Sequence, residues 1–521
     1  MSRGDFSGVG TIPELFESAV ERSGSAPWLT FEGSTYSYEH AYERVGAVAA
    51  RLAEYGVRRG DRVLATARNE PRYLFTWLGV TSLGAVIAAV DPDSTPAELR
   101  ALVSQLTPSL IVTGEDLRTT VEEGAPASAA GRVISVDALA RAPASATPHV
   151  DSSPGDIAVM IPTSGTTGRP KLVMQTHGAY VLAAEGFPFW LGLSSKDRLM
   201  TALPLFHLNA PAYSVLGSLA AGARLILLRR FSAERFFDEA RRYGATEFNA
   251  IGAMLEILMR RPARTDDANN PIRLCFTGPS PSRQRQLEIE ERFGFEIVCG
   301  YALSESPYGL VWRRGTRPYG TLGSARQHPR LGVINHARVL RDDGSEAQPG
   351  EVGELELNNP AIMAGYFDMP EETSRVVCDG WLRTGDLVRV NADGTYTFVA
   401  RRKEIIRRRG ENLSPVEVEV ALESHPDVVE AAVIGVPSEL SEEEVKAFVV
   451  PVPGATLNPW ALREFVATRV SAFKVPRYME TVASLPHTAT GRVAKRRLPR
   501  ERTPAEVDLA QPASADERAG T

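Results

Sequence analysis

The sequence predicts an α/β fold with largely parallel sheets in its first half. The alternation of helical segments with short apolar runs supports this class. The length of 521 residues and the hydrophobic fraction of 43% are those of an ordinary globular protein. At roughly 100–200 residues per domain, this length suggests two to four domains. A chain of this size can bury a large core, which excludes intrinsic disorder for most of it.

The expected elements of the first half alternate along the chain. Helices are predicted at 38–55 and 70–83, and strands at 61–66, 85–90, 110–113 and 132–136. Apolar runs of this length can be buried strands or buried helices, and their pattern alone leaves this open. The longest apolar stretch, 77–90, is too short to span a bilayer and is interpreted as a buried helix followed by a strand.

The second half has a different pattern. Short β-rich runs at 353–357 and 396–399 are separated by Asp-Gly turns, which predicts antiparallel strands over 331–400. Charge density rises after Arg401 and new amphipathic elements begin at Ser414, so a domain boundary is expected here. The polar, Ala/Pro-rich residues 501–521 are predicted to be a disordered tail.

Charge and cysteine content limit the classes of function that are expected. The net charge of −6 argues against a general binder of nucleic acids or anionic membranes, but it allows a local basic site for a phosphorylated cofactor. The three cysteines form neither a CxxC pair nor a Cys/His cluster, which argues against a disulfide scaffold or structural zinc. The N-terminus lacks a signal-peptide layout, so a cytoplasmic location is expected.

One segment has the composition of a phosphate-binding loop. The apolar run 157–161 leads into the residues Thr163, Ser164, Gly165, Thr166, Thr167, Gly168 and Lys171. Glycines let backbone N–H groups turn toward an anion, hydroxyls add donors, and lysine adds positive charge. A flexible surface turn is the alternative interpretation, and the Walker pattern is absent because no Gly-Lys-Ser/Thr closes the loop.

This run, followed by Thr176-His177, closely resembles a motif of the adenylate-forming superfamily, which includes acyl-CoA synthetases, adenylation domains of peptide synthetases and beetle luciferases. The resemblance covers roughly residues 10–500, because further motifs follow in the family order. It implies a large N-terminal domain of layered α/β sheets with a β-rich subdomain at 1–400, a hinge at 401–403, and a small mobile α+β domain at 404–500.

The resemblance assigns roles within the large domain. His207 would form part of the wall of the acyl pocket. The loop that stacks along adenine would be formed by Gly278, Pro279 and Ser280. Tyr301 would pack on adenine, Ser304 would contact the α-phosphate, and Glu305 would hold Mg²⁺, a hard cation that prefers oxygen ligands.

Further roles fall near the predicted hinge. Asp386 would accept hydrogen bonds from both ribose hydroxyls, which suits an acceptor-only carboxylate, and Arg401 would also reach the ribose. Lys403 lies at the hinge about which the small domain would rotate. In the loop 407–415, Gly410 would line the pantetheine tunnel, and the arginine cluster that ends in Arg409 would meet the phosphates of coenzyme A; a solvated basic surface is the alternative.

The last motif departs from the family pattern. Related enzymes have a lysine that bridges the acid carboxylate and the α-phosphate during adenylation, and Arg492 stands at this position. A guanidinium is wider than an ammonium, and a displacement of about 1 Å can cost on the order of 100-fold in rate. Three hypotheses stay open: Arg492 substitutes for lysine, Lys495 takes the role, or adenylation is impaired and the chain is specialised for thioesterification of acyl-AMP.

Together these residues predict an acyl-CoA ligase for a lipophilic carboxylic acid, with ATP, Mg²⁺ and coenzyme A as cofactors. Apolar residues at 187–191 and 208–212 suggest an apolar acid pocket. The alternatives are an adenylating enzyme with another acceptor and a non-catalytic nucleotide-binding protein. Expected partners are the acid or acyl-adenylate, coenzyme A, a separate adenylating enzyme if adenylation is impaired, and a second copy in a homodimer; neither nucleic-acid binding nor a membrane span is expected.

Overall fold

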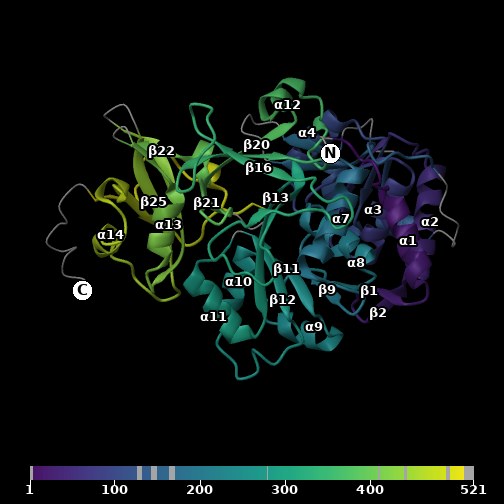
Figure 1. Cartoon of the computed structure of the whole chain (residues 1–521), viewed down its shortest axis with the longest axis horizontal. Helices are drawn as coiled ribbons and strands as arrows, with labels where there is room; N and C mark the ends of the chain where they lie inside the picture. Colours follow the sequence, from purple (N-terminus) through teal and green to yellow (C-terminus); the bar gives the residue numbers. More distant parts are fainter. Residues whose placement is uncertain are drawn as a thin grey trace. The chain divides into compact units, whose positions relative to one another are not determined.

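The computed structural model describes residues 4–125, 132–141, 150–163, 170–278, 280–408, 411–438, 443–488 and 493–509. The chain forms two compact units, one made of Met1–Arg338 and Glu356–Thr384, the other of Val339–Leu355 and Gly385–Thr521. Both contain helices and sheets (Figure 1), which confirms the predicted α/β class with a larger and a smaller part. The domain bounds and the hinge at 401–403 stay predictions.

A seven-stranded sheet in the first unit carries the predicted phosphate-binding loop. Across the sheet the described strands are β18 (Gly365–Tyr366), β8 (Lys171–Thr176), β7 (Ile157–Thr163), β4 (Val86–Ala89), β3 (Arg62–Thr66), β5 (Leu110–Thr113) and β6 (Val133–Ser135). Pairing is parallel from β7 to β6, whereas β8 and β18 are antiparallel. Side chains alternate between faces, so Val63 packs into the main core and Leu64 into a second cluster.

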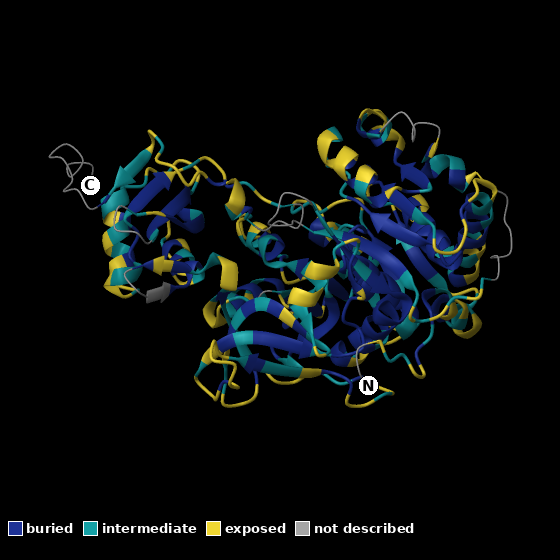
Figure 2. Cartoon of the chain, turned by 90° about the horizontal axis from the view of Figure 1, so that it is seen from above, coloured by how far each residue is buried: buried dark blue, intermediate teal, exposed yellow. Residues whose placement is uncertain are grey.

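A nine-stranded sheet forms the other layer of strands in this unit. Across the described part of the chain its order is β15 (Ser324–Ala325), β14 (Ser306–Val311), β13 (Glu296–Leu303), β12 (Leu274–Gly278), β11 (Glu247–Ile251), β9 (Arg198–Thr201), β10 (Arg224–Leu227), β1 (Pro27–Phe31) and β2 (Ser34–Ser37). The strands from β13 to β1 pair in parallel, and their residues are mostly buried (Figure 2).

Helices cover these sheets. They are α1 (Ile12–Ser23), α2 (Tyr38–Glu54), α3 (Pro71–Ser82), α4 (Pro96–Leu106), α5 (Arg118–Gly124), α6 (Val136–Ala140), α7 (His177–Leu191), a π-helix (Ala210–Val215), α8 (Leu216–Ala221), α9 (Phe236–Tyr243), α10 (Gly252–Met259), α11 (Arg283–Phe293) and α12 (Pro370–Val376). The predicted helices at 38–55 and 70–83 are α2 and α3. Helix α1 begins at a capping box in which Thr11 and Glu14 bond each other's backbone N–H groups.

A third sheet contains the predicted antiparallel strands. Its order is β16 (His336–Leu340), β17 (Val352–Asn358), β20 (Trp381–Val390) and β19 (Val377–Cys378), and β21 (Tyr396–Arg401) pairs with β20. Strands β19 and β21 are both antiparallel to β20. Gly394, in the turn between β20 and β21, has φ +76, a backbone conformation that glycine adopts readily.

The second unit contains a four-stranded sheet and a short hairpin. The strands are β24 (Val428–Pro437), β25 (Glu443–Pro451), β26 (Tyr478–Thr481) and β27 (Glu506–Asp508), with the hairpin β22 (Ile406–Arg408) and β23 (Glu411–Leu413) and the helices α13 (Pro415–Glu423) and α14 (Pro459–Ala467). Helix α13 follows the predicted start at Ser414. Val433 packs in one apolar cluster and Ile434 in another, because neighbouring residues of β24 face opposite sides.

The predicted disordered tail is wrong for its first part. Glu506–Asp508 forms β27, antiparallel to β26. The ammonium of the buried Lys446 lies 2.6 Å from Glu506 and 3.3 Å from Glu480. Because this ammonium needs carboxylates, it holds a segment whose own composition indicates disorder. In the part of the chain that the structure describes, no helix has the length and apolar character needed to cross a membrane.

Candidate functional site

The predicted phosphate-binding loop connects two paired strands. Thr163 ends β7, Lys171 begins β8, and the two residues are partners in the antiparallel register. The Thr163 hydroxyl donates to the Lys171 carbonyl at 3.2 Å. The first and last residues of the loop therefore lie side by side, at the same end of the strand pair β7 and β8. Its predicted residues Ser164, Gly165, Thr166, Thr167 and Gly168 lie outside the described residues.

The Lys171 ammonium is held at a defined place. Its Nζ lies 2.7 Å from Oε2 of Glu372 and 4.7 Å from the centre of the Tyr366 ring. The Lys171 side chain is 15% exposed. An ammonium has three donors, so contact with one carboxylate leaves donors for a phosphate. The hydrogen bond from Lys171 lowers the pKa of Glu372, which keeps the pair ionised.

Glu305 contacts the hydroxyl of the same tyrosine. The Tyr366 hydroxyl donates to Oε1 of Glu305 at 2.8 Å, and the backbone N–H of Met363 donates to the Glu305 carbonyl at 2.8 Å. The carbonyl of Ser304 accepts a hydrogen bond from the Gln175 side chain at 2.7 Å. The turn between β13 and β14 is thereby tied to β8, the strand that begins at Lys171.

These residues fit a nucleotide with Mg²⁺. Mg²⁺ in such sites takes one or two carboxylates and completes its shell with phosphate oxygens and water. The described residues contain no cluster of three or more His, Cys, Asp or Glu side chains that could hold a metal alone. Glu305 would therefore hold the ion together with phosphates bound at Lys171. The roles of both residues stay predictions.

The predicted adenine loop lies at the carboxyl ends of neighbouring strands. Gly278 ends β12, and a Cβ added there would lie 2.6 Å from the Gly300 carbonyl oxygen, so only glycine fits without movement. Tyr301 follows on β13, opposite Leu310, and is half-buried. Ser280 donates from its hydroxyl to the Pro281 carbonyl at 3.3 Å. Pro279 lies outside the described residues.

The candidate acyl-pocket residues are divided between the interior and the surface. His207 is half-buried beside Phe206, at 4.3 Å between ring centres. Phe187 is buried and stacks on Tyr213 at 5.2 Å. Phe189 is 59% exposed, so the run 187–191 does not line a pocket throughout.

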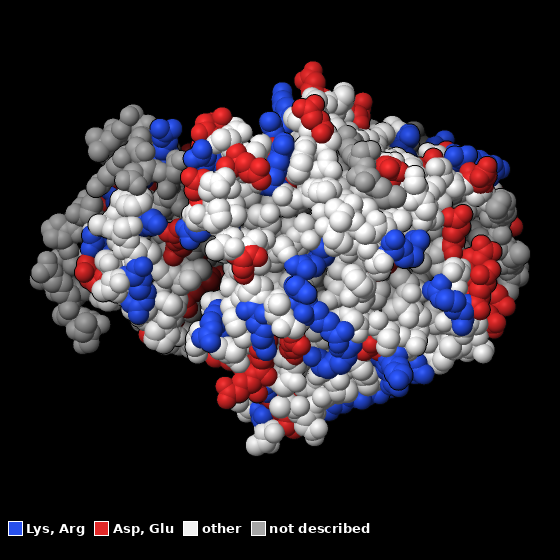
Figure 3. Space-filling view, viewed as in Figure 1, with Lys and Arg blue, Asp and Glu red and all other residues white. Residues whose placement is uncertain are grey.

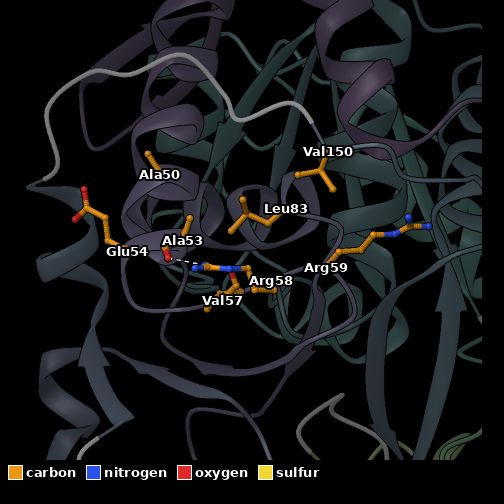
Figure 4. A pocket seen from close by; sticks show the side chains of 8 residues that line it. All are labelled: Ala50, Ala53, Glu54, Val57, Arg58, Arg59, Leu83 and Val150. Atoms are coloured by element: carbon orange, nitrogen blue, oxygen red, sulfur yellow. Dashed lines mark hydrogen bonds between the residues drawn. The ribbon is translucent and has the colours of Figure 1, made fainter.

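A surface cavity elsewhere in the first unit is not this site. It has a volume of about 520 Å³ and is lined by the end of α2, residues 57–59, Leu83 and Val150 (Figure 4). None of the predicted functional residues lines it.

Basic side chains gather on the face that carries α9 and α10 (Figure 3), although the net charge of the chain is −6.

In the second unit, Asp386 and Arg401 form an ion pair. They are register partners on β20 and β21, with Nε of Arg401 2.7 Å from Oδ1 of Asp386. Asp386 is fully buried. The guanidinium compensates the charge of this carboxylate and orients it. The ribose contact of Asp386 stays a prediction. Lys403 is exposed, in a 3₁₀ turn formed by Arg402–Glu404.

Lys495 is engaged with carboxylates of its own unit. Its Nζ lies 2.6 Å from Glu419 and 3.6 Å from Glu404. Burial raises the pKa of Glu419, and the positive charge of Lys495 opposes that shift. An isolated antiparallel bridge joins His487 to Val493, and Arg492 lies outside the described residues.

One arginine of the 407–415 loop, Arg408, does not belong to a solvated basic surface. Arg408 is buried and its guanidinium lies 2.6 Å from Glu444. It also donates to the carbonyls of Phe473 and Val475. Arg408 therefore stabilises the second unit and is not available to coenzyme A. Arg409 and Gly410 lie outside the described residues.

Two residues that sequence reasoning did not identify complete the first-unit site. Tyr366 contacts both Lys171 and Glu305, and Glu372 pairs with Lys171. Neither lies in a segment with recognisable phosphate chemistry. Tyr366 and Glu372 reach the site because Tyr366 pairs with Val173 in an antiparallel register. A strand of two residues has no sequence pattern from which this pairing could be predicted.

Two family models match the chain. Residues 16–367 match the model of the AMP-binding enzyme, and residues 417–492 match that of the AMP-binding enzyme C-terminal domain. A crotonobetaine/carnitine–CoA ligase of Salmonella enteritidis is 29% identical over 524 residues, which cover 95% of this chain and 100% of the relative.

Solved structures resemble the chain over nearly its whole length. ATP-bound MatB from Rhodopseudomonas palustris has a TM-score of 0.85 at 26% identity, covering 94% of this chain and 98% of that one. A benzoate CoA ligase from Burkholderia xenovorans has a TM-score of 0.84 at 24% identity, covering 94% and 99%. The second similarity concerns the fold alone.

Proposed function

Since the chain belongs to the AMP-binding enzyme family, we propose that it joins a carboxylic acid to coenzyme A through an acyl-adenylate. Membership confirms the resemblance drawn from the sequence motifs. The observation that carries the proposal is that Tyr366 contacts both a cation and a carboxylate: the Lys171 ammonium lies over its ring, and Glu305 accepts a hydrogen bond from its hydroxyl. A polyphosphate with its metal requires both charges. The crotonobetaine/carnitine–CoA ligase among the relatives supports coenzyme A as the acceptor.

In the first half-reaction, a carboxylate oxygen of the acid attacks the α-phosphorus of ATP and pyrophosphate leaves. Lys171 would bind the phosphates, and Thr163 would contribute its hydroxyl beside the loop. Mg²⁺ held by Glu305 would neutralise charge on the phosphates. Preorganised charges of this kind stabilise the transition state without reorganisation during the reaction.

In the second half-reaction, the thiol sulfur of coenzyme A attacks the acyl carbonyl carbon, the thiol loses its proton, and AMP leaves. Asp386 would hold the ribose hydroxyls, with its carboxylate oriented by Arg401. Gly410 would line the path of the pantetheine arm. Rotation about the hinge at 401–403 would exchange the two catalytic arrangements.

The acid that we propose is lipophilic. Support comes from an apolar cluster that includes Tyr213 of the π-helix, in which Phe187 stacks on Tyr213 and Phe276 packs edge-on against both. His207 precedes this segment and would contribute to the wall. Acids that differ in chain length, tested against one another, would define the class more closely.

A second candidate function is thioesterification of an acyl-adenylate made by a separate enzyme. Lys495, which would have to replace the missing lysine, is bound to Glu419 and Glu404. Freeing its ammonium would leave Glu419, whose side chain is 13% exposed, without a cation, which is costly. Adenylation would then depend on Arg492, whose planar guanidinium differs from an ammonium in reach and shape.

The two half-reactions distinguish these functions when they are assayed separately. Pyrophosphate release from acid, ATP and Mg²⁺ reports adenylation, and acyl-CoA formation from synthetic acyl-AMP and coenzyme A reports thioesterification. We expect thioesterification to be the faster step, and Arg492→Lys to raise pyrophosphate release on the order of 100-fold. Nitrite, amines or a carrier protein in place of coenzyme A test other acceptors.

Matched variants complete this experiment. If Lys495 serves adenylation, Lys495→Ala lowers pyrophosphate release and Arg492→Lys restores it. Rapid acid-dependent pyrophosphate release by the unmodified chain, with no gain from Arg492→Lys, would contradict the thioesterification role. AMP binding without either half-reaction would contradict the ligase assignment as well.

A further inference from the structure

Tyr366 links the two charged groups of the first-unit site. Its ring lies 4.7 Å from the Lys171 ammonium, and its hydroxyl donates to Glu305 at 2.8 Å. A cation is attracted to the negative face of an aromatic ring. A hydrogen bond to an ionised carboxylate is stronger and more directional than a neutral one. One side chain thereby fixes the spacing between a cation and a carboxylate.

The surroundings of Tyr366 hold this side chain in place. Its backbone pairs with Val173 on β8, and its N–H donates to the hydroxyl of Thr373 at 2.9 Å. The residue is 6% exposed. Glu372 contacts the Lys171 ammonium from α12 at 2.7 Å. A lysine side chain loses considerable rotamer freedom when it is held, so these contacts preorganise its ammonium before a phosphate binds.

We propose that Tyr366 is a positioning residue for ATP with Mg²⁺. Through its hydroxyl it orients Glu305 toward the metal, and through its ring it keeps the Lys171 ammonium toward the phosphates. This inference rests on the proposed function, because that function brings a metal and a polyphosphate to the two groups together. A tyrosine with a purely structural role would affect stability, but it would not separate metal binding from phosphate binding.

Two substitutions separate the hydroxyl from the ring. Tyr366→Phe removes the hydrogen bond to Glu305 and keeps the ring under Lys171, whereas Tyr366→Leu removes both contacts. Tyr38→Phe is the matched control, because Tyr38 is buried in the first unit and its hydroxyl donates to the Ala223 carbonyl at 2.6 Å. Calorimetric titration of the full chain with ATP, over a series of Mg²⁺ concentrations, measures binding without turnover.

We expect Tyr366→Phe to raise the Mg²⁺ concentration for half-maximal ATP binding about tenfold, since it removes a hydrogen bond to a charged group. ATP affinity without Mg²⁺ should stay at the wild-type value in this variant. Tyr366→Leu should in addition weaken Mg²⁺-free ATP binding about threefold, because the cation–ring contact is lost. The Tyr38→Phe control should change neither quantity.

A second background tests whether the hydroxyl acts through Glu305. In Glu305→Gln, the further change Tyr366→Phe should no longer alter the Mg²⁺ requirement. If the Tyr366 variants do not fold, Glu372→Gln acts on the same ammonium from the surface of α12. It should weaken ATP binding equally with and without Mg²⁺, and a change confined to the Mg²⁺ requirement would overturn the assigned division of roles.

The outcomes are distinct from those of the proposed function. An unchanged Mg²⁺ requirement in Tyr366→Phe, or equal losses with and without Mg²⁺, would overturn the inference even if the wild type forms acyl-CoA. A wild-type chain that binds ATP with Mg²⁺ but forms no acyl-CoA would overturn the proposed function. The assignment of Tyr366 would then stand on the binding data.

Discussion

Lys446 is a fully buried cation that joins three separate parts of the second unit. Its ammonium contacts Glu480 on β26 and Glu506 on β27, and it donates to the carbonyl of Glu501 at 3.2 Å. A buried charge is tolerated only when it is paired and hydrogen-bonded. These contacts explain why the segment after 500 is ordered as far as β27.

Replacement of this lysine should loosen the C-terminal sheet. Lys446→Met leaves Glu506 and Glu480 without their cation, and removal of one partner of a buried ion pair typically costs about 3–5 kcal/mol of unfolding free energy. Hydrogen exchange of β25–β27 in the full chain would measure the loss. Lys474→Met is the control, since its pair with Glu417 is more exposed and such pairs contribute about 0–1 kcal/mol. Equal exchange in both variants would refute the structural role of Lys446.

Individual functional residues differ in how far the sequence identifies them. Lys171, Glu305 and Asp386 stand in motifs whose residue types suit their chemistry, and the structure gives each a charged or hydrogen-bonded partner. Tyr366 has no such motif, because its role depends on two contacts that form only when β18 pairs with β8. For Arg408 the sequence is misleading. Its arginine neighbours suggest a basic surface, whereas the side chain is buried and pairs with Glu444.

At the scale of elements, strand prediction succeeded where the apolar pattern is local. The predicted strand at 110–113 coincides with β5, and the predicted strand at 85–90 contains β4. Pairing between strands that are distant in sequence cannot be predicted in this way, because it depends on which strands become neighbours in the fold. Strand β27 is three residues long and polar, and it forms because β26 offers an edge and Lys446 attracts its carboxylate.

Helix α7 begins at a buried histidine whose charge state should affect stability. His177 is the first residue of α7, its Nδ1 accepts a hydrogen bond from the Ile12 N–H, and burial lowers its pKa to about 4. The positive end of the helix dipole also disfavours an imidazolium at this position. A neutral imidazole is therefore part of the packing between α1 and α7.

Acid should weaken this packing. An unfolded histidine has a pKa near 6.5, so the unfolded chain binds the proton more tightly, and stability falls as the pH drops below about 6.5. From pH 7 to pH 5, His177 should remove about 2 kcal/mol of unfolding free energy. His177→Asn should reduce this dependence in urea titrations at several pH values. His40→Asn is the control, because His40 is exposed. If the unfolding free energy depends on pH equally in both variants, His177 does not contribute to the acid sensitivity.

At the scale of the whole molecule, the residues of the two proposed half-reactions are found in both compact units. Lys171 and Glu305 belong to the first unit, and Asp386, Arg401 and Lys495 to the second. Lys171 pairs with Glu372, Asp386 with Arg401 and Lys495 with Glu419, and both members of each pair belong to the same unit. The predicted hinge at 401–403 lies within the second unit, after Asp386 and before Lys495, so the proposed rotation there would move Lys495 relative to Asp386 and leave each of these ion pairs intact.

Restriction of that backbone should separate the two half-reactions. Lys403 is exposed in its 3₁₀ turn, and proline fixes φ near −65°, so Lys403→Pro hinders rotation without burying a new group. We expect thioesterification to fall at least about tenfold relative to adenylation, since loss of catalytic geometry has effects of this order or larger. Lys403→Ala reports loss of the ammonium alone and should affect the ratio less. If the ratio of the thioesterification rate to the adenylation rate is the same in the proline and alanine variants, the hinge does not lie at Lys403.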